Sequence, residues 1–218
     1  MRYDRCRTLF GDDFEHIQKA KILLLGVGGV GSYCLDCLYR SGITDITIVD
    51  FDRFDITNQN RQIGSDHVDE IKVEVHAKMY PGITPINIKI DPAWVETFDF
   101  EPYDLIIDAI DDVEAKIAVI KKTYRKLISS MGSAKQTDPT RIEISTIWKT
   151  TNDKFAKKIR DRLRKERFDK KFPVVFSKEN AKCKDKGSFC AVTGAFGLTL
   201  CSLAIEKIVS SSKTKEAI

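Results

Sequence analysis

The stretch Gly26-Val27-Gly28-Gly29-Val30-Gly31 follows an apolar run that ends at Leu25, and it precedes a segment with helical apolar spacing. Glycine lets a backbone approach a phosphate closely, and the N-terminus of a following helix attracts negative charge. Asp50 closes the next apolar run roughly 20 residues further on, the offset at which such folds bond a ribose hydroxyl. These residues predict a nucleotide-binding strand, loop and helix, which by themselves fit nicotinamide cofactors as well as ATP.

Strand and helix patterns alternate on both sides of this stretch. We expect parallel strands at residues 21–26, 46–50, 86–90, 103–110 and 127–131, and helices between them at 30–41, 69–80 and 113–126. Further on we expect strands at 141–148 and 174–177, a polar loop at 179–187, a closing helix at 191–209 and a frayed end at 210–218. The alternation predicts an α/β fold, a doubly wound Rossmann-like sheet that is mainly parallel with antiparallel C-terminal strands.

Length and composition indicate one ordinary domain. The 218 residues are 42% hydrophobic and 31% charged, which suits a single domain over residues 1–218 with an N-terminal helical arm at 1–20. The first 21 residues carry charges where a signal peptide would be apolar, so we expect a cytoplasmic protein. The uncharged run at 189–205 is short for a membrane span and is interrupted by Gly and Thr, so we expect a buried helix there.

The net charge of +4 is concentrated late in the chain. A basic helix is predicted at 149–172, with one apolar stripe formed by Phe155, Ile159 and Leu163. Its remaining faces carry Lys and Arg, among them Arg160 and Arg164. Two interpretations stay open: a solvated charged face, or a surface for nucleic-acid phosphates.

The six cysteines predict reduced thiols and no disulfide framework. Cys34 and Cys37 form a C-x-x-C inside a predicted helix, and no second pair accompanies them, so a zinc site is not expected. Core packing accounts for Cys34, Cys37 and Cys201. Unreactive thiols are preferred for Cys183 and Cys190, while a thiol nucleophile at either one stays an alternative.

Charged side chains follow the predicted strands at the edge where such folds bind ligands. Arg61 has the planar fork that grips phosphate oxygens, and Lys72 begins a predicted helix from which it would reach the α-phosphate. Asp111 and Asp112 follow the strand at 103–110, where a carboxylate would bind magnesium. The alternative treats Arg61 and Lys72 as surface cations and Asp111 as a helix N-cap.

The residues GVGGVGSYCLDCLYRSGITDITIVDFDRFDITNQNRQ, with Lys72 and Asp111, resemble the adenylation domain of the ThiF/MoeB and ubiquitin-activating-enzyme superfamily. The resemblance implies ATP and Mg²⁺ as cofactors, bound by Gly26, Gly28, Gly29, Gly31, Asp50, Asn58, Arg61, Lys72, Asp111 and Asp112. Within this set it implies that Arg61, Lys72 and Asp111 are catalytic and that Asp111 is the metal ligand. Arg5 matches an arginine that such proteins insert into the partner subunit's ATP site, which implies a homodimer.

The second half is similar to a narrower family, the tRNA threonylcarbamoyladenosine dehydratases. The similar segments are residues 130–133, 138–142, 148–150 and 174–179, together with the basic helix. This implies an enzyme that uses ATP to adenylate the carboxylate of threonylcarbamoyladenosine in tRNA, after which the modification cyclises with loss of water. No cysteine relay is needed, because a tethered nucleophile has an effective molarity of about 10⁵–10⁸ M.

Three alternatives remain open. The first is activation of the C-terminus of a ubiquitin-like sulfur-carrier protein, with a sulfur-transfer protein as partner; the absence of a second cysteine pair departs from the MoeB pattern and weakens it. The second is a nucleotide-binding scaffold without turnover. The third, a nicotinamide dehydrogenase, would leave Arg61, Lys72 and Asp111 without a role. The segment at 179–187 is short for the dehydratase family, which bears on the expected tRNA contacts.

Overall fold

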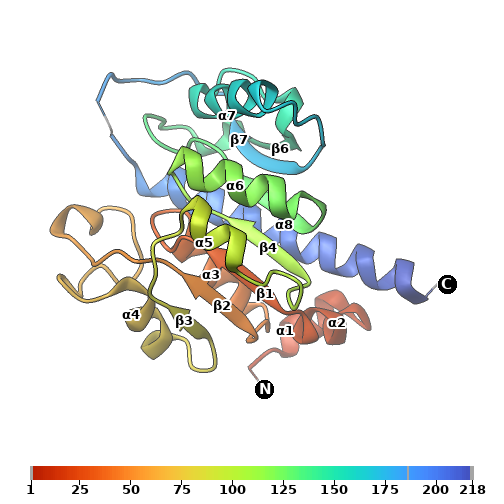
Figure 1. The fold of residues 1–218 in the computed structure, drawn as a ribbon. Helices are drawn as coiled ribbons and strands as arrows, with labels where there is room; N and C mark the ends of the chain where they lie inside the picture. The colour runs from red at the N-terminus through yellow and green to blue at the C-terminus, as the bar shows by residue number, and fades with distance from the viewer. Residues whose placement is uncertain (1, 186, 217–218) are drawn as a thin grey trace.

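Seven strands form one sheet in the order β3-β2-β1-β4-β5-β7-β6 in the computed structural model, which describes residues 2–185 and 187–216 (Figure 1). The strands are β1 (Ile22–Leu25), β2 (Ile46–Val49), β3 (Thr84–Ile86), β4 (Leu105–Asp108), β5 (Leu127–Ser130), β6 (Ile142–Thr146) and β7 (Pro173–Ser177). Neighbouring strands are parallel, except that β6 at the edge runs antiparallel to β7. The predicted fold class is therefore confirmed.

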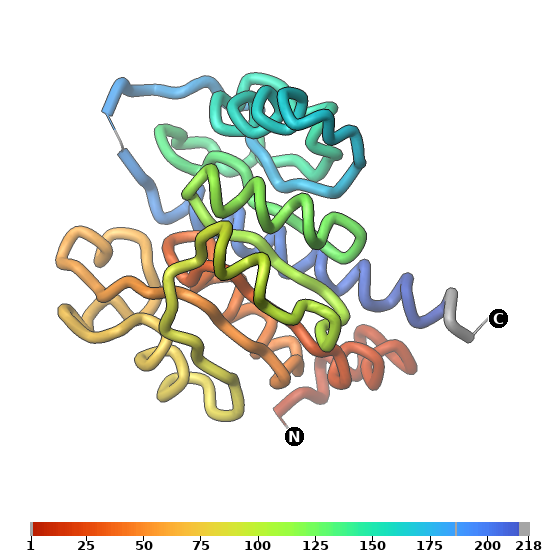
Figure 2. The backbone as a smooth tube through the Cα atoms, in the orientation of Figure 1, coloured from red at the N-terminus to blue at the C-terminus, as the bar shows by residue number. Residues whose placement is uncertain are grey.

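Helices cover both faces of the sheet (Figures 1 and 2). They are α1 (Asp4–Phe10), α2 (Asp13–Lys19), α3 (Gly31–Arg40), α4 (Lys72–Met79), α5 (Pro92–Thr97), α6 (Val113–Thr123), α7 (Lys154–Lys165) and α8 (Cys190–Glu216). On β1, Ile22 and Leu24 pack into the core shared with α2, α3 and α8, while Leu23 and Leu25 pack into the core shared with α5, α6 and α7. Burial on both faces explains why the central strands β1 and β2 are nearly continuous apolar runs in the sequence.

Several elements differ from those predicted from the sequence. The basic helix spans Lys154–Lys165 in place of 149–172, because Asp153 caps its start and Arg167 has a positive φ of 55° just after its end. The strand expected at 86–90 lies at Thr84–Ile86. Helix α5 was not predicted; it begins at Pro92 and is capped by Asp91, whose side chain accepts a hydrogen bond from the Trp94 amide.

The last helix is longer than expected. It continues to Glu216, where a frayed end was predicted over 210–218; residues 217 and 218 lie outside the described part. Its Cys190–Lys213 portion is long and apolar enough to cross a membrane by length and composition, but 56% of its most apolar window is buried inside the protein. It packs against α3, as Figure 1 shows, and so contributes to the protein core.

Candidate functional site

The glycine loop, defined here as residues 26–31, lies at the carboxyl end of β1, where the strand order reverses between β1 and β4. Gly26 has a positive φ of 86°, and its amide donates to the Val49 carbonyl at 2.8 Å. A Cβ added at Gly31 would lie 1.9 Å from the Gly26 carbonyl oxygen, so a side chain there cannot be accommodated without movement. At Gly28 the nearest atom would be Gln62 Nε2 at 3.9 Å, which leaves that face of the loop open.

Asp50, just past the end of β2, is bonded to the glycine loop. Its Oδ2 accepts from the Val27 amide at 2.9 Å, and its Oδ1 accepts from the Asp52 amide at 2.9 Å. Burial raises the pKa of the Asp50 carboxyl, while the two backbone hydrogen bonds and the charge of Lys72 oppose that shift. A carboxylate has lone pairs beyond these two bonds, so Asp50 can also accept a ligand hydroxyl.

Lys72 is the first residue of α4, and its side chain is only 5% exposed. Its Nζ lies 3.0 Å from Asp52 Oδ2, and its amide donates to the Asp52 carbonyl at 3.0 Å. Asp52 itself is half exposed, so the pair sits at the rim of the site. The arrangement brings one cation to the same edge as Asp50 and the glycine loop.

The segment from Asn58 to Ile63 folds over the glycine loop. Asn58 is buried, and its Oδ1 accepts from the Asp55 amide at 3.3 Å in a capping box. The Arg61 side chain packs along Gly29, with its Cγ 3.3 Å from where a Cβ would stand, and its Nη1 donates to the Thr57 carbonyl at 2.8 Å. The Ile63 amide donates to Ser32 Oγ on α3 at 3.2 Å, which ties the two segments together.

Gln62 received no role from the sequence. Its Nε2 faces Gly28, and its Oε1 is buried without a hydrogen-bond partner among the described residues. A buried acceptor without a partner is unfavourable unless a ligand or water satisfies it. Gln62 is therefore a further candidate contact at the open face of the loop; its signal in the sequence was that it ends the run that carries the family resemblance.

Asp111 and Asp112 follow β4, and both are exposed. Asp112 caps α6, because its Oδ1 accepts from the Ala115 amide at 2.8 Å; the alternative that Asp111 is the N-cap is wrong. Among the residues that the structure describes, no three metal-ligating side chains come together. A single carboxylate together with phosphate oxygens of a bound nucleotide is a common set of ligands for Mg²⁺, and the exposed Asp111 carboxylate would fit such a set.

Arg5 lies on α1, at the opposite end of α3 from the glycine loop. Helix α1 is attached there by hydrogen bonds from Tyr3 Oη to the Tyr39 carbonyl (3.4 Å) and from Cys6 Sγ to the Arg40 carbonyl (3.9 Å). Arg5 is exposed and is not brought to the glycine loop of its own chain.

The cysteines are divided between core and surface. Burial raises the pKa of the Cys34 thiol, and Cys201 is buried beside it in the same core, between α3 and α8. Cys190 Sγ lies 2.8 Å from Tyr33 Oη, a hydrogen bond that raises the pKa of Tyr33 to about 12. Cys183 is exposed. All these thiols are free in the structure.

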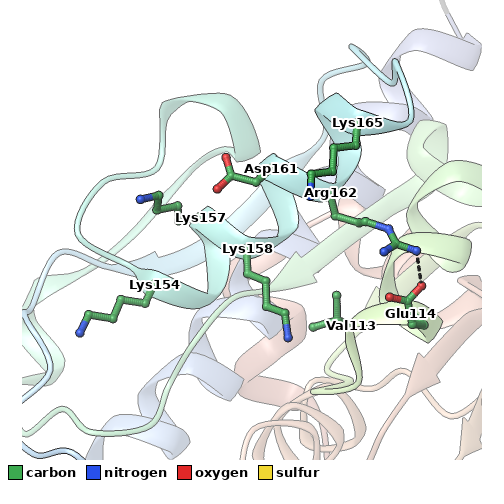
Figure 3. Close-up of a pocket in the computed structure, with 8 residues that line it drawn as sticks. All are labelled: Val113, Glu114, Lys154, Lys157, Lys158, Asp161, Arg162 and Lys165. Atoms are coloured by element: carbon green, nitrogen blue, oxygen red, sulfur yellow. Dashed lines mark hydrogen bonds and ion pairs between the residues drawn. The ribbon is translucent and has the colours of Figure 1, made fainter.

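A groove of about 360 Å³ separates the start of α6 from α7 (Figure 3). It is lined by Val113, Glu114, Lys154, Lys157, Lys158, Asp161, Arg162 and Lys165. Arg162 pairs with Glu114 at 2.6 Å, while Lys158 extends toward Val113 (Figure 3). Arg160 instead turns inward and donates to Thr150. We call this feature the basic groove.

The model of the ThiF family matches residues 3–217. The chain belongs to the ThiF family. Within this family it is 39% identical to the tRNA threonylcarbamoyladenosine dehydratase of Bacillus subtilis, over 78% of this chain and 71% of that protein. It is 32% identical to the protein of the same name from Haemophilus influenzae, over 91% of this chain and 89% of that protein.

Solved structures give the same family assignment. The crystal structure of the E. coli tRNA N6-threonylcarbamoyladenosine dehydratase TcdA in complex with ATP superimposes with a TM-score of 0.93 at 31% identity, covering 98% of this chain and 96% of that chain. The E. coli MccB complex with ATP has a TM-score of 0.65 at 20% identity, over 96% of this chain and 64% of that chain, and shares the fold alone.

Proposed function

We propose that this ThiF-family protein uses ATP to adenylate the carboxylate of threonylcarbamoyladenosine in tRNA and so drives its cyclisation. The carboxylate attacks the α-phosphorus and pyrophosphate leaves; ring closure then releases AMP, which carries away the carboxylate oxygen, so the net loss is one water. One observation carries the proposal: Arg61 and Asp50 contact the glycine loop, and Lys72 lies close enough to Asp50 for its charge to oppose the rise that burial causes in the pKa of that carboxyl, in a chain that matches dehydratases over most of its length. No covalent relay through Cys183 or Cys190 is required.

We assign the ATP contacts by their place around the glycine loop. Gly26, Gly28, Gly29 and Gly31 form the phosphate cradle, and Asp50 bonds the ribose. Asn58, Arg61 and Lys72 hold the phosphates, and Lys72 at its buried position stabilises charge on the α-phosphate as adenylyl transfer proceeds.

Magnesium and a second subunit would complete the site. Asp111, with Asp112 beside it at the start of α6, would hold Mg²⁺, which screens phosphate charge when bound. Arg5 stands far from its own glycine loop, so it would serve the site of a second copy, in a homodimer. Such a tRNA-modifying enzyme would work in the cytoplasm.

The basic groove is the proposed tRNA contact. Its five cations lie on one helix, and the groove begins at Val113, two residues after Asp111. A phosphate backbone that followed α7 would therefore pass close to the adenylation site, with affinity that falls as salt rises. Lys157 and Lys158 are better test positions than Arg160, which is tied to Thr150.

The test is substrate-dependent release of AMP. Purified protein with ATP and Mg²⁺ is mixed with tRNA that carries threonylcarbamoyladenosine, with the same tRNA lacking it, or with a ubiquitin-like sulfur carrier. AMP released only with the modified tRNA is the expected result. Release with the carrier alone would assign the protein to carrier activation with a sulfur-transfer partner, and ATP binding without AMP release would favour a scaffold.

A further inference from the structure

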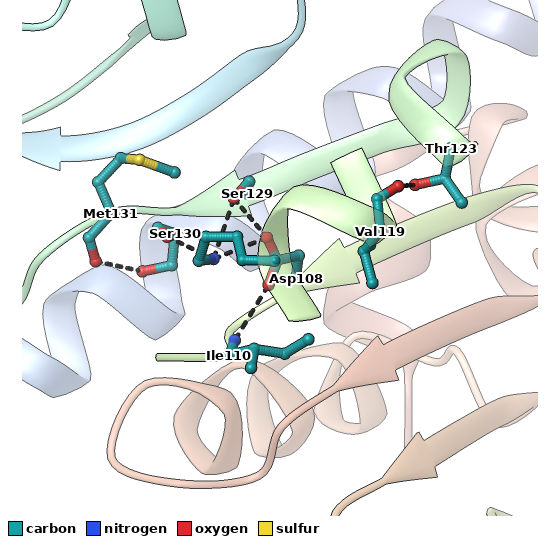
Figure 4. A network of polar contacts seen from close by, with 8 residues as sticks. Asp108, Ile110, Val119, Thr123, Ser129, Ser130 and Met131 are labelled. Carbon is teal, nitrogen blue, oxygen red and sulfur yellow. Dashed lines mark hydrogen bonds and ion pairs between the residues drawn. The ribbon is translucent and has the colours of Figure 1, made fainter. Parts of the chain in front are cut away.

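An ion pair between Lys116 on α6 and Asp108 on β4 is fully buried. Figure 4 shows Asp108 together with Ser129 and Ile110. Lys116 Nζ lies 2.7 Å from Asp108 Oδ2, and it also donates to Ser129 Oγ at 3.2 Å and to the Ser130 carbonyl at 3.0 Å. Both side chains have an exposed fraction of 0%. All three ammonium protons have an acceptor, so the lysine is held in one geometry.

Stability alone does not explain this pair. Two charges lose their hydration when they are buried, and replacing such a pair by apolar residues of similar size is often neutral or stabilising. The surrounding core offers apolar neighbours on both elements, namely Ile106 and Ile107 on β4 and Ile117 and Val119 on α6. The pair therefore suggests a role in holding a particular geometry.

The geometry it holds is the turn between β4 and α6. Asp108 Oδ1, the oxygen not used by Lys116, accepts from the Ile110 amide at 3.1 Å. Ala109, which lies between Asp108 and Ile110 in the chain, packs against the glycine loop. Its carbonyl oxygen lies 3.0 Å from where a Cβ of Gly26 would stand. The next residue after Ile110 is Asp111, so the same turn carries the proposed magnesium ligand.

We propose that Asp108 and Lys116 are positioning residues of the adenylation site. Lys116 and Ser129 fix one carboxylate oxygen of Asp108, and the other oxygen fixes the Ile110 amide. The turn of residues 109–111 is thereby held so that Asp111 and the glycine loop keep their relative places. This inference rests on the proposed role of Asp111 in the ATP site.

Two neutral variants separate positioning from stability. Asp108→Asn with Lys116→Met removes both charges and keeps an acceptor for the Ile110 amide. Asp108→Leu with Lys116→Met removes the charges and the acceptor, at similar side-chain volume. Both are expected to fold, and their affinity for ATP is measured by calorimetry with Mg²⁺ and with EDTA.

Adding Mg²⁺ should raise the ATP affinity of the Asn variant by the same factor as that of the wild-type protein. For the Leu variant this factor should be about tenfold smaller, a difference of about 1.4 kcal/mol. In an Asp111→Asn background the Leu variant should have no further effect on that gain. Equal gains for the two variants, or a Leu effect that persists without Asp111, would overturn the inference. If the Leu variant does not fold, Ser129→Ala should reduce the gain in the same direction, and an unchanged gain would overturn it.

The same titrations separate this inference from the proposed function. If wild-type protein binds ATP no better with Mg²⁺, or if Asp111→Asn leaves that gain unchanged, the role of Asp111 itself fails and the positioning inference falls with it. If wild-type protein and Asp111→Asn behave as proposed while the two neutral variants do not differ, only the positioning inference fails.

Discussion

Replacing Gly31 by alanine tests the packing of the glycine loop most sharply. The new Cβ would stand 1.9 Å from the Gly26 carbonyl oxygen and 2.9 Å from its carbon. That oxygen would have to retreat by about 1.5 Å to reach ordinary van der Waals contact, and overpacking of this kind destabilises a protein by about 1–3 kcal/mol. For a chain of this size, a loss of about 1–3 kcal/mol lowers Tm by roughly 2–12 °C.

The displaced loop should also lose function, because a misplacement of about 1 Å can reduce turnover by about 100-fold. Thermal unfolding, ATP titration and AMP release measure the three effects. Gly28→Ala is the matched control: its Cβ would meet nothing nearer than 3.9 Å, and its φ is not positive. It should leave Tm unchanged or slightly raised, while ATP affinity falls because the Cβ occupies the open face of the loop. A Gly31→Ala protein with wild-type Tm and ATP affinity would refute this reasoning.

The remaining predictions concern single side chains. Lys72→Ala should lower kcat for AMP release by about 100-fold or more without unfolding the protein. Lys78→Ala, on the exposed side of the same helix, is the control and should have no effect. Full turnover by the Lys72→Ala protein would exclude Lys72 from phosphate binding. Burial and the charge of Lys72 lower the pKa of His76 to about 4, below its usual value of about 6.5. Between these two pH values the folded state therefore binds fewer protons than the unfolded state. The free energy of unfolding should be highest above about pH 6.5 and should decrease by up to about 3 kcal/mol as the pH falls toward 4. Urea unfolding of His76→Leu should lack this decrease, and an equal decrease in both proteins would contradict it. Lys157→Glu with Lys158→Glu should weaken tRNA binding and flatten its salt dependence, by about one unit of log–log slope for each phosphate that is no longer neutralised; unchanged affinity would assign the basic groove to solvent.

The buried parallel strands were predictable because each is a short apolar run with no polar face. Residues 22–25 and 46–49 are buried at every position, so their sequence reveals them directly. Strand β3 was misplaced because it lies at the edge of the sheet, where Thr84 and Pro85 are exposed and supply no such pattern. Helix α5 has six residues, too few for a helical period to be detected.

The site was predictable where one local stretch supplies it, and not where the sheet brings distant residues together. Asp50 was placed by its offset from the glycine loop, and the hydrogen bond to Val27 shows the contact that this offset permits. Lys116 looked like any polar residue of an amphipathic helix, because its burial depends on Asp108 and Ser129 on two adjacent strands. The inward turn of Arg160 was equally hidden, since it depends on the turn that precedes α7.

The dehydration of threonylcarbamoyladenosine in tRNA can be followed directly by mass spectrometry. Purified protein is incubated with ATP, Mg²⁺ and tRNA that carries threonylcarbamoyladenosine, with Lys72→Ala protein as the control, and the RNA is then digested to nucleosides. We expect the wild-type protein to convert the modified nucleoside to one lighter by a single water, and the Lys72→Ala protein not to do so. An unchanged nucleoside in the presence of folded, ATP-binding wild-type protein would contradict this expectation.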